Sequence, residues 1–573
     1  MNLKQRKLLI LLIFLSMLPS VLLLGHDMMD IDSAQYAEIA REMTDSNQYL
    51  FIRDNGRKYL DKPIMTFWLV SASFKLFGQN NFAFRLPSLL FAFLSIFSIY
   101  RITVLRFDKH TNRELFGLLA GLLYASTPGL FSMLVSPLID IYLTSFLIFT
   151  HHAYYLARKK DSRYFYVMYF MMGCGFITKG PIAVIIPGIS IGVDLLIRRD
   201  FKGIVSMKVV QGIFIVAALP LFWSWILFQE FSWYGPNFFV IIQSFGRFYS
   251  YIYNQKFDPL FFVKNFAWAF GLFILPLAGY VVYTLVQLIK RSKPVLKQPS
   301  VLAKSLLSFF KSDRFTKGDY VIGLWLFLTL FLISFSRFQL PQYIYWILPA
   351  AAIFMAGVLG PLLFDEATDN RQAKAWLFYL IPVVLVLLFV AIPAFAFDLH
   401  GIDWLLYGLS LLPWMVWPFV RQSLPNRLTI PVLSGMMIHL VVSLLVYGLL
   451  IAYQPSSAIA RTVRQLEPGQ KELYKFLISN SQRSYAFYSK RYTRDIFHKE
   501  PFEASLQKDG FRLVILSDEG FQNFESFTKG RYRIEVLEEH LSYKVSMPSQ
   551  AFFNKKKRPG VLRKVYLARV SLL

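Results

Sequence analysis

The sequence predicts an α-helical protein that crosses a membrane many times and carries a small soluble α/β domain at its C-terminal end. Of its 573 residues, 55% are apolar and only 17% are charged, whereas soluble domains carry about 25% charged residues. Apolar runs of about 20 residues, the length that crosses a bilayer, recur along most of the chain. The composition then changes near residue 455. These observations exclude an ordinary soluble protein.

The apolar runs predict about thirteen transmembrane helices within residues 1–454. The first run ends near residue 24, and no Ala-x-Ala-like cleavage site follows it, so we interpret it as a retained span that starts in the cytoplasm. Spans are expected near residues 8–25, 86–106, 115–130, 135–157, 164–178, 181–198, 208–228, 260–289, 319–335, 343–364, 374–397, 403–420 and 430–453.

The basic residues orient these spans. The chain has 61 Lys and Arg against 35 Asp and Glu, a formal net charge of +26. In a membrane protein this excess belongs to cytoplasmic loops that face anionic headgroups, so no nucleic-acid partner is expected. One set of short loops holds only Lys179, Arg247, Lys256 and Arg337, and the other holds many more. The segments predicted outside the cytoplasm are 26–85, 229–259 and the region from 455.

The first external loop, residues 26–85, contains two amphipathic stretches that are too short or too polar to span a membrane. The first, 33–43, begins with a capping-type Ser33, and the second covers 64–77. Both are expected to lie flat at the membrane interface, with Phe67 and Trp68 at headgroup level.

The C-terminal region, residues 455–573, contains runs typical of β-strands at 511–516 and 532–537. It is predicted to form a separate soluble α/β domain. Its basic run at 555–558 is expected to be solvated or to face lipid headgroups.

Ionisable side chains gather on the external side of the predicted bundle. Such groups at the edge of an apolar helix cost several kcal/mol unless they are paired or line an aqueous cavity. We therefore expect one polar cavity at the outer leaflet, suited to a phosphate-bearing lipid, with a carboxylate left to act on a nucleophile. The residues concerned are His26, Asp27, Asp30, Asp32, Asp61, Lys62, Asp140, Lys179, Arg247, Arg337 and Tyr343.

A metal cofactor is an open alternative. The single cysteine, Cys174, excludes an intramolecular disulfide and a thiolate-rich metal site. His26, Asp30 and Asp32 offer one imidazole and two carboxylates to a divalent cation, although such a site normally needs further ligands.

A series of sequence blocks, in order along the chain, resembles the bacterial aminoarabinose transferase and protein mannosyltransferase-like family. The blocks are Asp32–Met43, Asp61–Pro63, Arg85–Ser88, Gly175–Ile182, Gly235–Phe238, Arg247–Phe248, Ser334–Ile344 and Phe487–Arg491. Members of that family are integral-membrane glycosyltransferases of the GT-C fold, so the resemblance implies this fold for the chain.

The resemblance implies transfer of a hexosyl or pentosyl group from a polyprenyl (undecaprenyl) phosphate donor. The acceptor would lie at the periplasmic face of a bacterial inner membrane and would be lipid A, lipopolysaccharide, or another glycan or protein hydroxyl. Many relatives are thought to work without a metal.

Individual residues match the family's functional positions. Asp32 matches the catalytic aspartate of the first loop, and Asp140 matches the second cavity aspartate. Lys62 and Arg247 match residues that hold the lipid phosphate, and Tyr343 matches a cavity tyrosine. Arg337 is expected to bind the donor phosphate with them, and Asp30, Asp61 and Lys179 are expected to support the site.

The chain also departs from the family pattern. It has Asp32-Ser33 where the family often has Asp-Glu, Asp61-Lys62-Pro63 where it often has Glu-Lys-Pro, and Ser336-Arg337-Phe338-Gln339 in a block that normally contains lysine. These departures leave the sugar and the acceptor open.

Two other functions remain as alternatives. A transporter or flippase of lipid-linked sugars could also use a charged cavity, but such sites usually lie near the membrane midplane between repeated halves. A structural assembly subunit would leave the polar first loop without a role.

Overall fold

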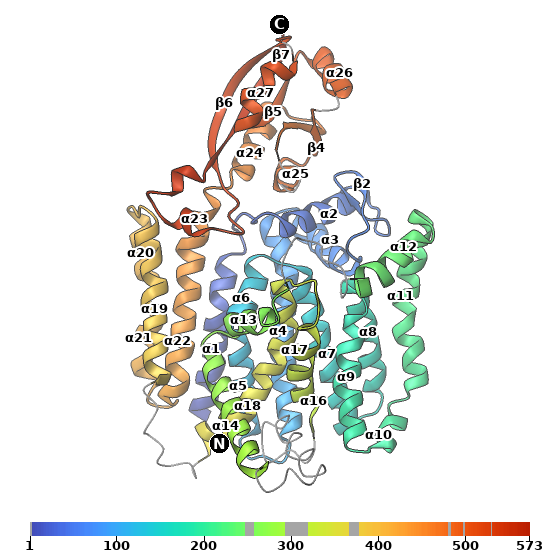
Figure 1. Ribbon diagram of the computed structural model, residues 1–573, viewed down its shortest axis with the longest axis vertical. Coiled ribbons are helices and arrows are strands. Elements are labelled where there is room, and N and C mark those ends of the chain that lie inside the picture. The colour runs from blue at the N-terminus through green and yellow to red at the C-terminus, as the bar shows by residue number, and fades with distance from the viewer. Residues whose placement is uncertain are drawn as a thin grey trace.

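The computed structural model describes residues 3–246, 257–292, 319–365, 377–478, 483–496, 499–528 and 530–573. A bundle of helices is covered at one end by two helices that lie across it, α2 (Asp32–Ser46) and α3 (Met65–Phe77). The C-terminal domain lies beyond them (Figure 1). We call this covered end of the bundle the capped end.

The helices of the bundle come from the described residues between 3 and 451. Its first half consists of α1 (Leu3–Leu22), α4 (Asn81–Arg106), α5 (Arg113–Ala125), α6 (Pro128–Val135), α7 (Ile139–Lys159), α8 (Tyr164–Lys179), α9 (Ile182–Ile197), α10 (Phe201–Ser206), α11 (Val209–Phe231), α12 (Tyr234–Asn237) and η1 (Phe238–Phe245). Its second half consists of α13 (Phe261–Phe270), η3 (Gly271–Phe273), α14 (Ile274–Ser292), α16 (Val321–Gly323), η4 (Leu324–Leu328), α17 (Thr329–Ile333), η5 (Pro341–Ile347), α18 (Leu348–Phe364), α19 (Leu377–Ala396), α20 (Ile402–Ser410), α21 (Leu412–Val420), α22 (Asn426–Val441), η7 (Val442–Val446) and α23 (Tyr447–Ile451).

Six helical segments among the described residues are long and apolar enough to cross a membrane. They are Leu3–Leu22, Asn81–Arg106, Val209–Phe231, Phe261–Gln287, Pro341–Phe364 and Asn426–Ile451. A seventh results if α5 and α6, bent by 54° at their junction, form one span. Other predicted spans coincide with helices that are shorter, interrupted or more polar. The class of a helical polytopic membrane protein is therefore confirmed.

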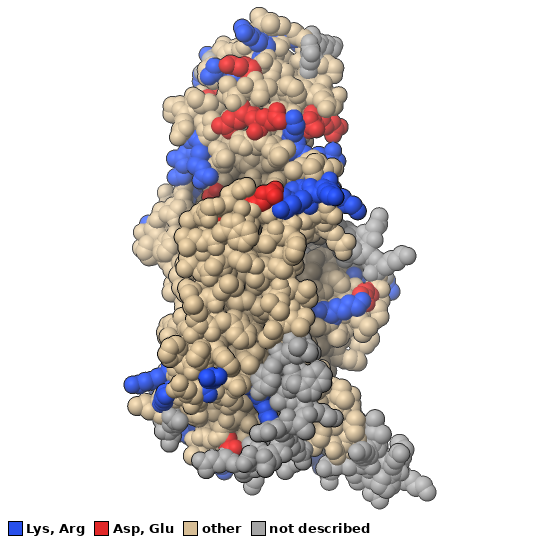
Figure 2. Space-filling model, turned by 90° about the vertical axis from the view of Figure 1, so that its left-hand side faces the viewer, with Lys and Arg blue, Asp and Glu red and all other residues tan. Residues whose placement is uncertain are grey.

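The distribution of charge agrees with this class. On the face shown in Figure 2, a broad band of the bundle carries few charged side chains. Lys, Arg, Asp and Glu gather on the C-terminal domain above the band, and Lys and Arg gather near the opposite end. Such a band is expected where lipid tails surround the protein, because exposed charge is costly there.

The first loop folds into more than two surface helices. Between α2 and α3, strands β1 (Arg53–Asp54) and β2 (Arg57–Lys58) form a short antiparallel hairpin. Its turn residues Asn55 and Gly56 both have positive φ, 56° and 75°, and an Asn-Gly pair adopts such a turn readily.

The position of α2 corrects the expectation of an interfacial helix. This helix lies between the bundle and the C-terminal domain (Figure 1), and even its charged residues Glu38, Arg41 and Glu42 are buried. Its polar face is tolerated in the interior because Arg41 forms ion pairs with Glu38 and Asp45. The amphipathic pattern therefore reflects ion pairs inside the protein rather than contact with water or headgroups.

In α3, one of the two aromatic residues expected at headgroup level is also interior. Phe67 is fully buried. Trp68 is half-buried and donates a hydrogen bond from Nε1 to the backbone carbonyl of Tyr49.

The C-terminal domain is built on a mixed five-stranded sheet of order β4-β3-β5-β7-β6. Strand β3 pairs in parallel with β4 and β5, and β7 pairs antiparallel with β5 and β6. The predicted strands at 511–516 and 532–537 are confirmed as parts of β5 and β6. Its elements are α24 (Ser456–Leu466), β3 (Glu472–Phe476), α25 (Ser484–Ser489), β4 (Tyr492–Asp495), α26 (Lys499–Asp509), β5 (Phe511–Ser517), α27 (Asp518–Thr528), β6 (Tyr532–Ser542), α28 (Gln550–Phe553), η8 (Arg558–Gly560) and β7 (Arg563–Leu572).

Candidate active site

An ion pair between two neighbouring helices forms the base of the site. Helices α7 and α8 are packed together, and because a short turn joins them, α7 begins where α8 ends, at the capped end. Asp140 stands in the first turn of α7 and Lys179 in the last turn of α8, where the helix dipoles favour a carboxylate and a cation, respectively. Lys179 Nζ lies 2.5 Å from Asp140 Oδ1. Both side chains are largely buried, so the pair is shielded from solvent.

Two aromatic rings complete the surroundings of this pair. Residues 341–347 form the 3₁₀-helix η5, in which side chains three positions apart lie on one face. Tyr343 and Trp346 accordingly stack, with ring centroids 4.7 Å apart. Trp346 Nε1 donates a 2.9 Å hydrogen bond to Asp140 Oδ1. Lys179 Nζ lies 5.0 Å and 5.3 Å from the two ring centroids, which adds cation–π attraction.

A second pair of charges comes from the first loop. Lys62 forms an ion pair with the carboxylate of its neighbour Asp61. Gln243, on η1, donates from Nε2 to the same carboxylate. These contacts join the first loop to the segment that follows α11.

Three of these four charged residues, Asp61, Lys62 and Lys179, line one cavity of about 100 Å³, and the fourth, Asp140, pairs with Lys179. Its lining residues are Asp61, Lys62, Pro63, Lys179, Pro181, Ile182, Ile185, Phe239, Gln243, Ser244, Phe245, Ile333, Ser336, Tyr343 and Trp346. The cavity therefore combines two lysines, a carboxylate and an aromatic wall.

An apolar groove of about 770 Å³ shares three lining residues with this cavity: Pro181, Ile185 and Phe245. The groove is lined almost entirely by apolar side chains of α8, α9, α10 and α11. A charged cavity that continues into an apolar groove suits an amphiphile with an anionic head and a hydrocarbon tail.

Asp32 is the first residue of α2 and faces the charges of the cavity. Burial raises the pKa of its carboxyl above the ordinary value, Lys62 and Lys179 lower it, and Asp140 and Asp61 raise it. The charges that act on Asp32 therefore belong to three lining residues of the cavity and to Asp140, the partner of Lys179. Asp32 itself is not among the lining residues.

Ser33 fixes the start of α2 against the segment before α7. Its Oγ lies 2.6 Å from Ser136 Oγ and donates a 3.1 Å hydrogen bond to the carbonyl of Pro137. This contact brings Asp32 and Asp140 to adjoining segments. Ser33 thus has a structural partner at the position where the resembled family often has Glu.

Asp30 faces the C-terminal domain instead. Its carboxylate accepts hydrogen bonds from Oγ and from the backbone N–H of Ser484. Burial raises the pKa of Asp30 to about 7, and the hydrogen bonds from Ser484 oppose that rise.

The metal alternative finds no support in the described part of the chain. No group of three or more His, Cys, Asp or Glu side chains there is placed to hold a metal ion. The ring of His26 packs edge-on against Tyr447, with centroids 6.0 Å apart, while Asp30 bonds to Ser484. In the described residues, His26, Asp30 and Asp32 are therefore not gathered into a group that could hold a metal ion.

The sequence also predicted two arginines for this site. Arg337 is exposed and is not among the lining residues, although its neighbour Ser336 is. Arg247 lies outside the described residues.

Two residues of the site were not predicted from the sequence: Trp346 and Gln243. In the sequence, Trp346 stands three residues after Tyr343, in a segment that begins with Pro341. Since a short 3₁₀ turn puts side chains three positions apart on one face, this spacing could have indicated that Trp346 lies beside Tyr343. Gln243 stands in an apolar run, and its contact with Asp61 depends on tertiary structure alone.

Comparisons with known proteins agree with the resemblance found in the sequence. The family described as dolichyl-phosphate-mannose-protein mannosyltransferase matches residues 61–228. An undecaprenyl phosphate-α-4-amino-4-deoxy-L-arabinose arabinosyl transferase of Yersinia enterocolitica is 30% identical over 206 residues, which cover 34% of this chain and 35% of the relative. The enzyme of the same name from Serratia proteamaculans is 26% identical over 227 residues, covering 38% and 39%. The matches thus span little more than a third of each curated relative.

The fold is shared over a much longer region. The crystal structure of ArnT from Cupriavidus metallidurans bound to undecaprenyl phosphate matches with a TM-score of 0.72 and 17% identity, covering 97% of each chain. The apo structure of the same protein matches with a TM-score of 0.68 over the same share. The chain therefore has an ArnT-like fold, and the resemblance predicted from its sequence is confirmed.

Proposed function

We propose that the protein is an integral-membrane GT-C glycosyltransferase that moves a sugar from a polyprenyl phosphate donor to an acceptor at the periplasmic face of a bacterial inner membrane. The observation that carries this proposal is the cavity lined by Lys62 and Lys179, whose charges act on Asp32 and which shares lining residues with an apolar groove. The cavity suits a sugar phosphate head, and the groove suits a prenyl tail. The matched relatives are named for an undecaprenyl phosphate donor, which supports the same class.

In the proposed reaction, the bond between the sugar's anomeric carbon and the phosphate oxygen breaks, and polyprenyl phosphate leaves with the electron pair. A bond forms between the anomeric carbon and an acceptor oxygen. Lys62 and Lys179, with Arg247 from the second external loop, stabilise the negative charge that develops on the leaving phosphate. Asp140 and the two aromatic rings hold Lys179 in place for this task.

Asp32 acts on the acceptor. A hydroxyl acceptor must lose its proton as the new bond forms, and the carboxylate of Asp32 takes it. An acceptor that is already an anionic phosphate, such as a phosphate of lipid A, has no proton to lose, and Asp32 then positions the reacting groups. The name of the relatives favours an amino-pentose as the sugar; lipid A, lipopolysaccharide and other glycan or protein hydroxyls remain within the class as acceptors.

The proposal includes a membrane topology and a division into domains. Residues 1–454 form a transmembrane domain of about thirteen spans, with 26–85 as its first periplasmic loop, and residues 455–573 form a periplasmic α/β domain. The helices found at the predicted intervals, the asymmetry of basic residues and the position of the C-terminal domain beyond α2 and α3 support this arrangement.

The proposal is tested with full-length protein reconstituted in liposomes. The probe is a radiolabelled undecaprenyl phosphate sugar, and lipid A and a glycan hydroxyl are the acceptors. We expect labelled acceptor together with free undecaprenyl phosphate. A nucleotide sugar without a prenyl chain is the matched control and should give no product, because it cannot occupy the groove. Movement of labelled lipid across the bilayer without any glycosylated product would instead identify a transporter.

A further inference from the structure

The C-terminal domain holds the first loop at two carboxylates, Asp30 and Asp54. These residues flank the beginning of α2, where Asp32 stands, one before the helix and one in the hairpin after it. Their partners are Ser484 and Arg483, two consecutive residues at the start of α25. One short segment of the C-terminal domain thus holds the chain on both sides of α2.

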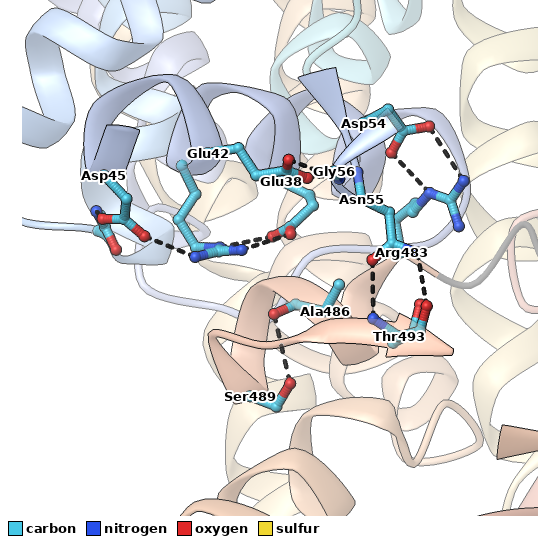
Figure 3. Close-up of polar contacts among 12 residues, drawn as sticks. Glu38, Glu42, Asp45, Asp54, Asn55, Gly56, Arg483, Ala486, Ser489 and Thr493 are labelled. Carbon is cyan, nitrogen blue, oxygen red and sulfur yellow. Dashed lines mark hydrogen bonds and ion pairs between the residues drawn. The ribbon is translucent and has the colours of Figure 1, made fainter. Parts of the chain in front are cut away.

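The contact of Arg483 with Asp54 is a two-point ion pair (Figure 3). Arg483 Nε lies 2.8 Å from Asp54 Oδ1, and its second nitrogen lies 3.1 Å from Oδ2. Both side chains are largely buried, at 18% and 9% exposure. Asp54 Oδ2 also accepts a 2.8 Å hydrogen bond from Gln35, in the first turn of α2. Arg483 is therefore linked to the start of α2 through one carboxylate.

The neighbouring hairpin turn is held in the same way. Asn55 Nδ2 donates to the carbonyl of Thr493, on β4, at 2.7 Å, and the N–H of Thr493 donates back to Asn55 Oδ1 at 2.8 Å (Figure 3). Glu42 of α2 accepts hydrogen bonds from the backbone N–H groups of Asn55 and Gly56. These contacts fix the orientation of α2 relative to the sheet of the C-terminal domain.

On the other side of Asp32, the segment 27–31 is held by both domains. The buried Arg85 of α4 donates to the carbonyls of His26 and Asp27. Beyond that point the partners change: Tyr488 Oη of α25 accepts from the N–H of Met28 at 2.6 Å, and Ser484 bonds to Asp30. The last residues before Asp32 are therefore held by α25 and by Gln454, which accepts from the N–H of Asp30 and donates to the carbonyl of Met28, both at 2.8 Å.

We infer that Arg483 and Ser484 are positioning residues for Asp32, so that the C-terminal domain completes the active site of the bundle without touching the substrate. This inference rests on the proposed function, because the placement of Asp32 affects rate only if Asp32 acts in the reaction. It assigns the C-terminal domain a role in turnover and none in binding of the donor, because the lysines proposed to hold the donor phosphate belong to the first loop and to α8.

The first test compares Ser484→Val with Ser484→Thr in the full-length protein. The two variants have the same shape and differ in the hydroxyl that donates to Asp30. We expect Ser484→Val to lower kcat by about 10- to 100-fold, since small displacements of reacting groups cost rate on this scale, and Ser484→Thr to stay within about threefold of wild type. Binding of undecaprenyl phosphate should remain within the same range in both. Equal losses in both variants would overturn the role of the hydroxyl.

The second test compares Arg483→Ala with Arg531→Ala. Arg531 forms an exposed pair with Glu503 in the same domain at 3.8 Å and does not contact the first loop. We expect Arg483→Ala to lower kcat and to leave donor binding unchanged, and Arg531→Ala to leave both unchanged. If Arg483→Ala weakens donor binding as much as turnover, or if neither changes, the positioning role is wrong.

Hydrogen exchange separates this inference from the proposed function. Arg483→Ala and Ser484→Val should accelerate amide exchange in residues 30–37, with residues 182–197 of α9 as an unchanged internal reference. Unchanged exchange in 30–37 would overturn the positioning role whatever the activity. Faster exchange in a protein that never transfers sugar would leave the contact established and the proposed function refuted.

Discussion

The charge of Asp32 depends on the charged side chains around it. Burial raises the pKa of its carboxyl, two lysines lower it, and two carboxylates raise it further. A carboxylate whose pKa is raised is a stronger base while it stays ionised, which suits the removal of a hydroxyl proton.

Removal of this base is the first prediction. Asp32→Asn keeps the size of the side chain and removes its charge and basicity, so turnover with a hydroxyl acceptor should fall by roughly 10²–10⁴-fold, while donor binding stays within a few-fold of wild type. The measurement is single-turnover transfer together with donor binding. Asp398→Asn is the matched control, since this exposed carboxylate pairs with Lys555 at the surface. Near-normal transfer by Asp32→Asn would refute the base assignment.

The second prediction concerns pH. The active form of Asp32 is deprotonated, so kcat/KM should fall as the pH drops through a pKa above the ordinary 3.8. Lys62→Gln removes a cation that lowers this pKa, so the acid limb should move to higher pH. Asp61→Asn removes an anion that raises it, so the limb should move to lower pH. Each shift should be a few tenths to about one pH unit. Shifts of the same sign would show that Asp32 does not control the limb.

At the scale of single elements, the end of α8 decides where Lys179 lies. The helix stops at Gly180, whose φ of +90° is a conformation that side chains with a Cβ rarely adopt. A Cβ at this position would also lie 3.3 Å from Ser244 Oγ. The chain reversal that places Lys179 against Asp140 therefore depends on glycine.

Gly180→Ala is the third prediction. The substitution should destabilise the protein by about 1 kcal/mol or more, because it strains the helix end, and it should weaken donor binding, because Lys179 is displaced. Thermal unfolding and titration with undecaprenyl phosphate measure the two effects. Gly279→Ala, at a helical glycine of α14 with open space around its Cβ position, should leave donor binding unchanged. Equal behaviour of the two variants would exclude a special role for the end of α8.

The sequence correctly predicted the elements that are marked by a local pattern of apolar residues. The apolar runs of the bundle and the strands β5 and β6 were located from periodicity, because burial on one or both faces leaves a direct trace in composition. The bend between α5 and α6 and the burial of α2 were missed. The charged face of α2 pairs within the protein, and a single sequence does not distinguish paired charges from solvated ones.

The same limit applied to the site. Asp61, Lys62, Lys179 and Tyr343 were correctly expected to share one cavity, because ionisable groups at helix ends are expected to converge. Asp30 and its partner Ser484 are 454 positions apart in the sequence, and Asp54 and its partner Arg483 are 429 positions apart. No local pattern marks such pairs, so only the structure reveals them.

At the scale of the whole molecule, the fourth prediction concerns topology. If the basic loops define the cytoplasmic side, the C-terminal domain and the capped end of the bundle face the periplasm. A reporter fused at about residue 460 that works only in the periplasm should therefore be active, and one fused at about residue 109, between α4 and α5, should be inactive. The reverse result would place the cavity on the cytoplasmic side and remove access to a periplasmic acceptor.

The contacts between α25 and the first loop join an early and a late part of the polypeptide, so they form only at the end of synthesis. Ribosomes synthesise the first loop early and Arg483 and Ser484 near the end, so the nascent chain inserts most of its helices before the partners of Asp30 and Asp54 exist. Until the last part of the polypeptide has folded, Asp32 lacks the contacts that α25 provides. Under the proposed function, we therefore expect no sugar transfer by an incomplete chain, with docking of the C-terminal domain as the step that completes the site.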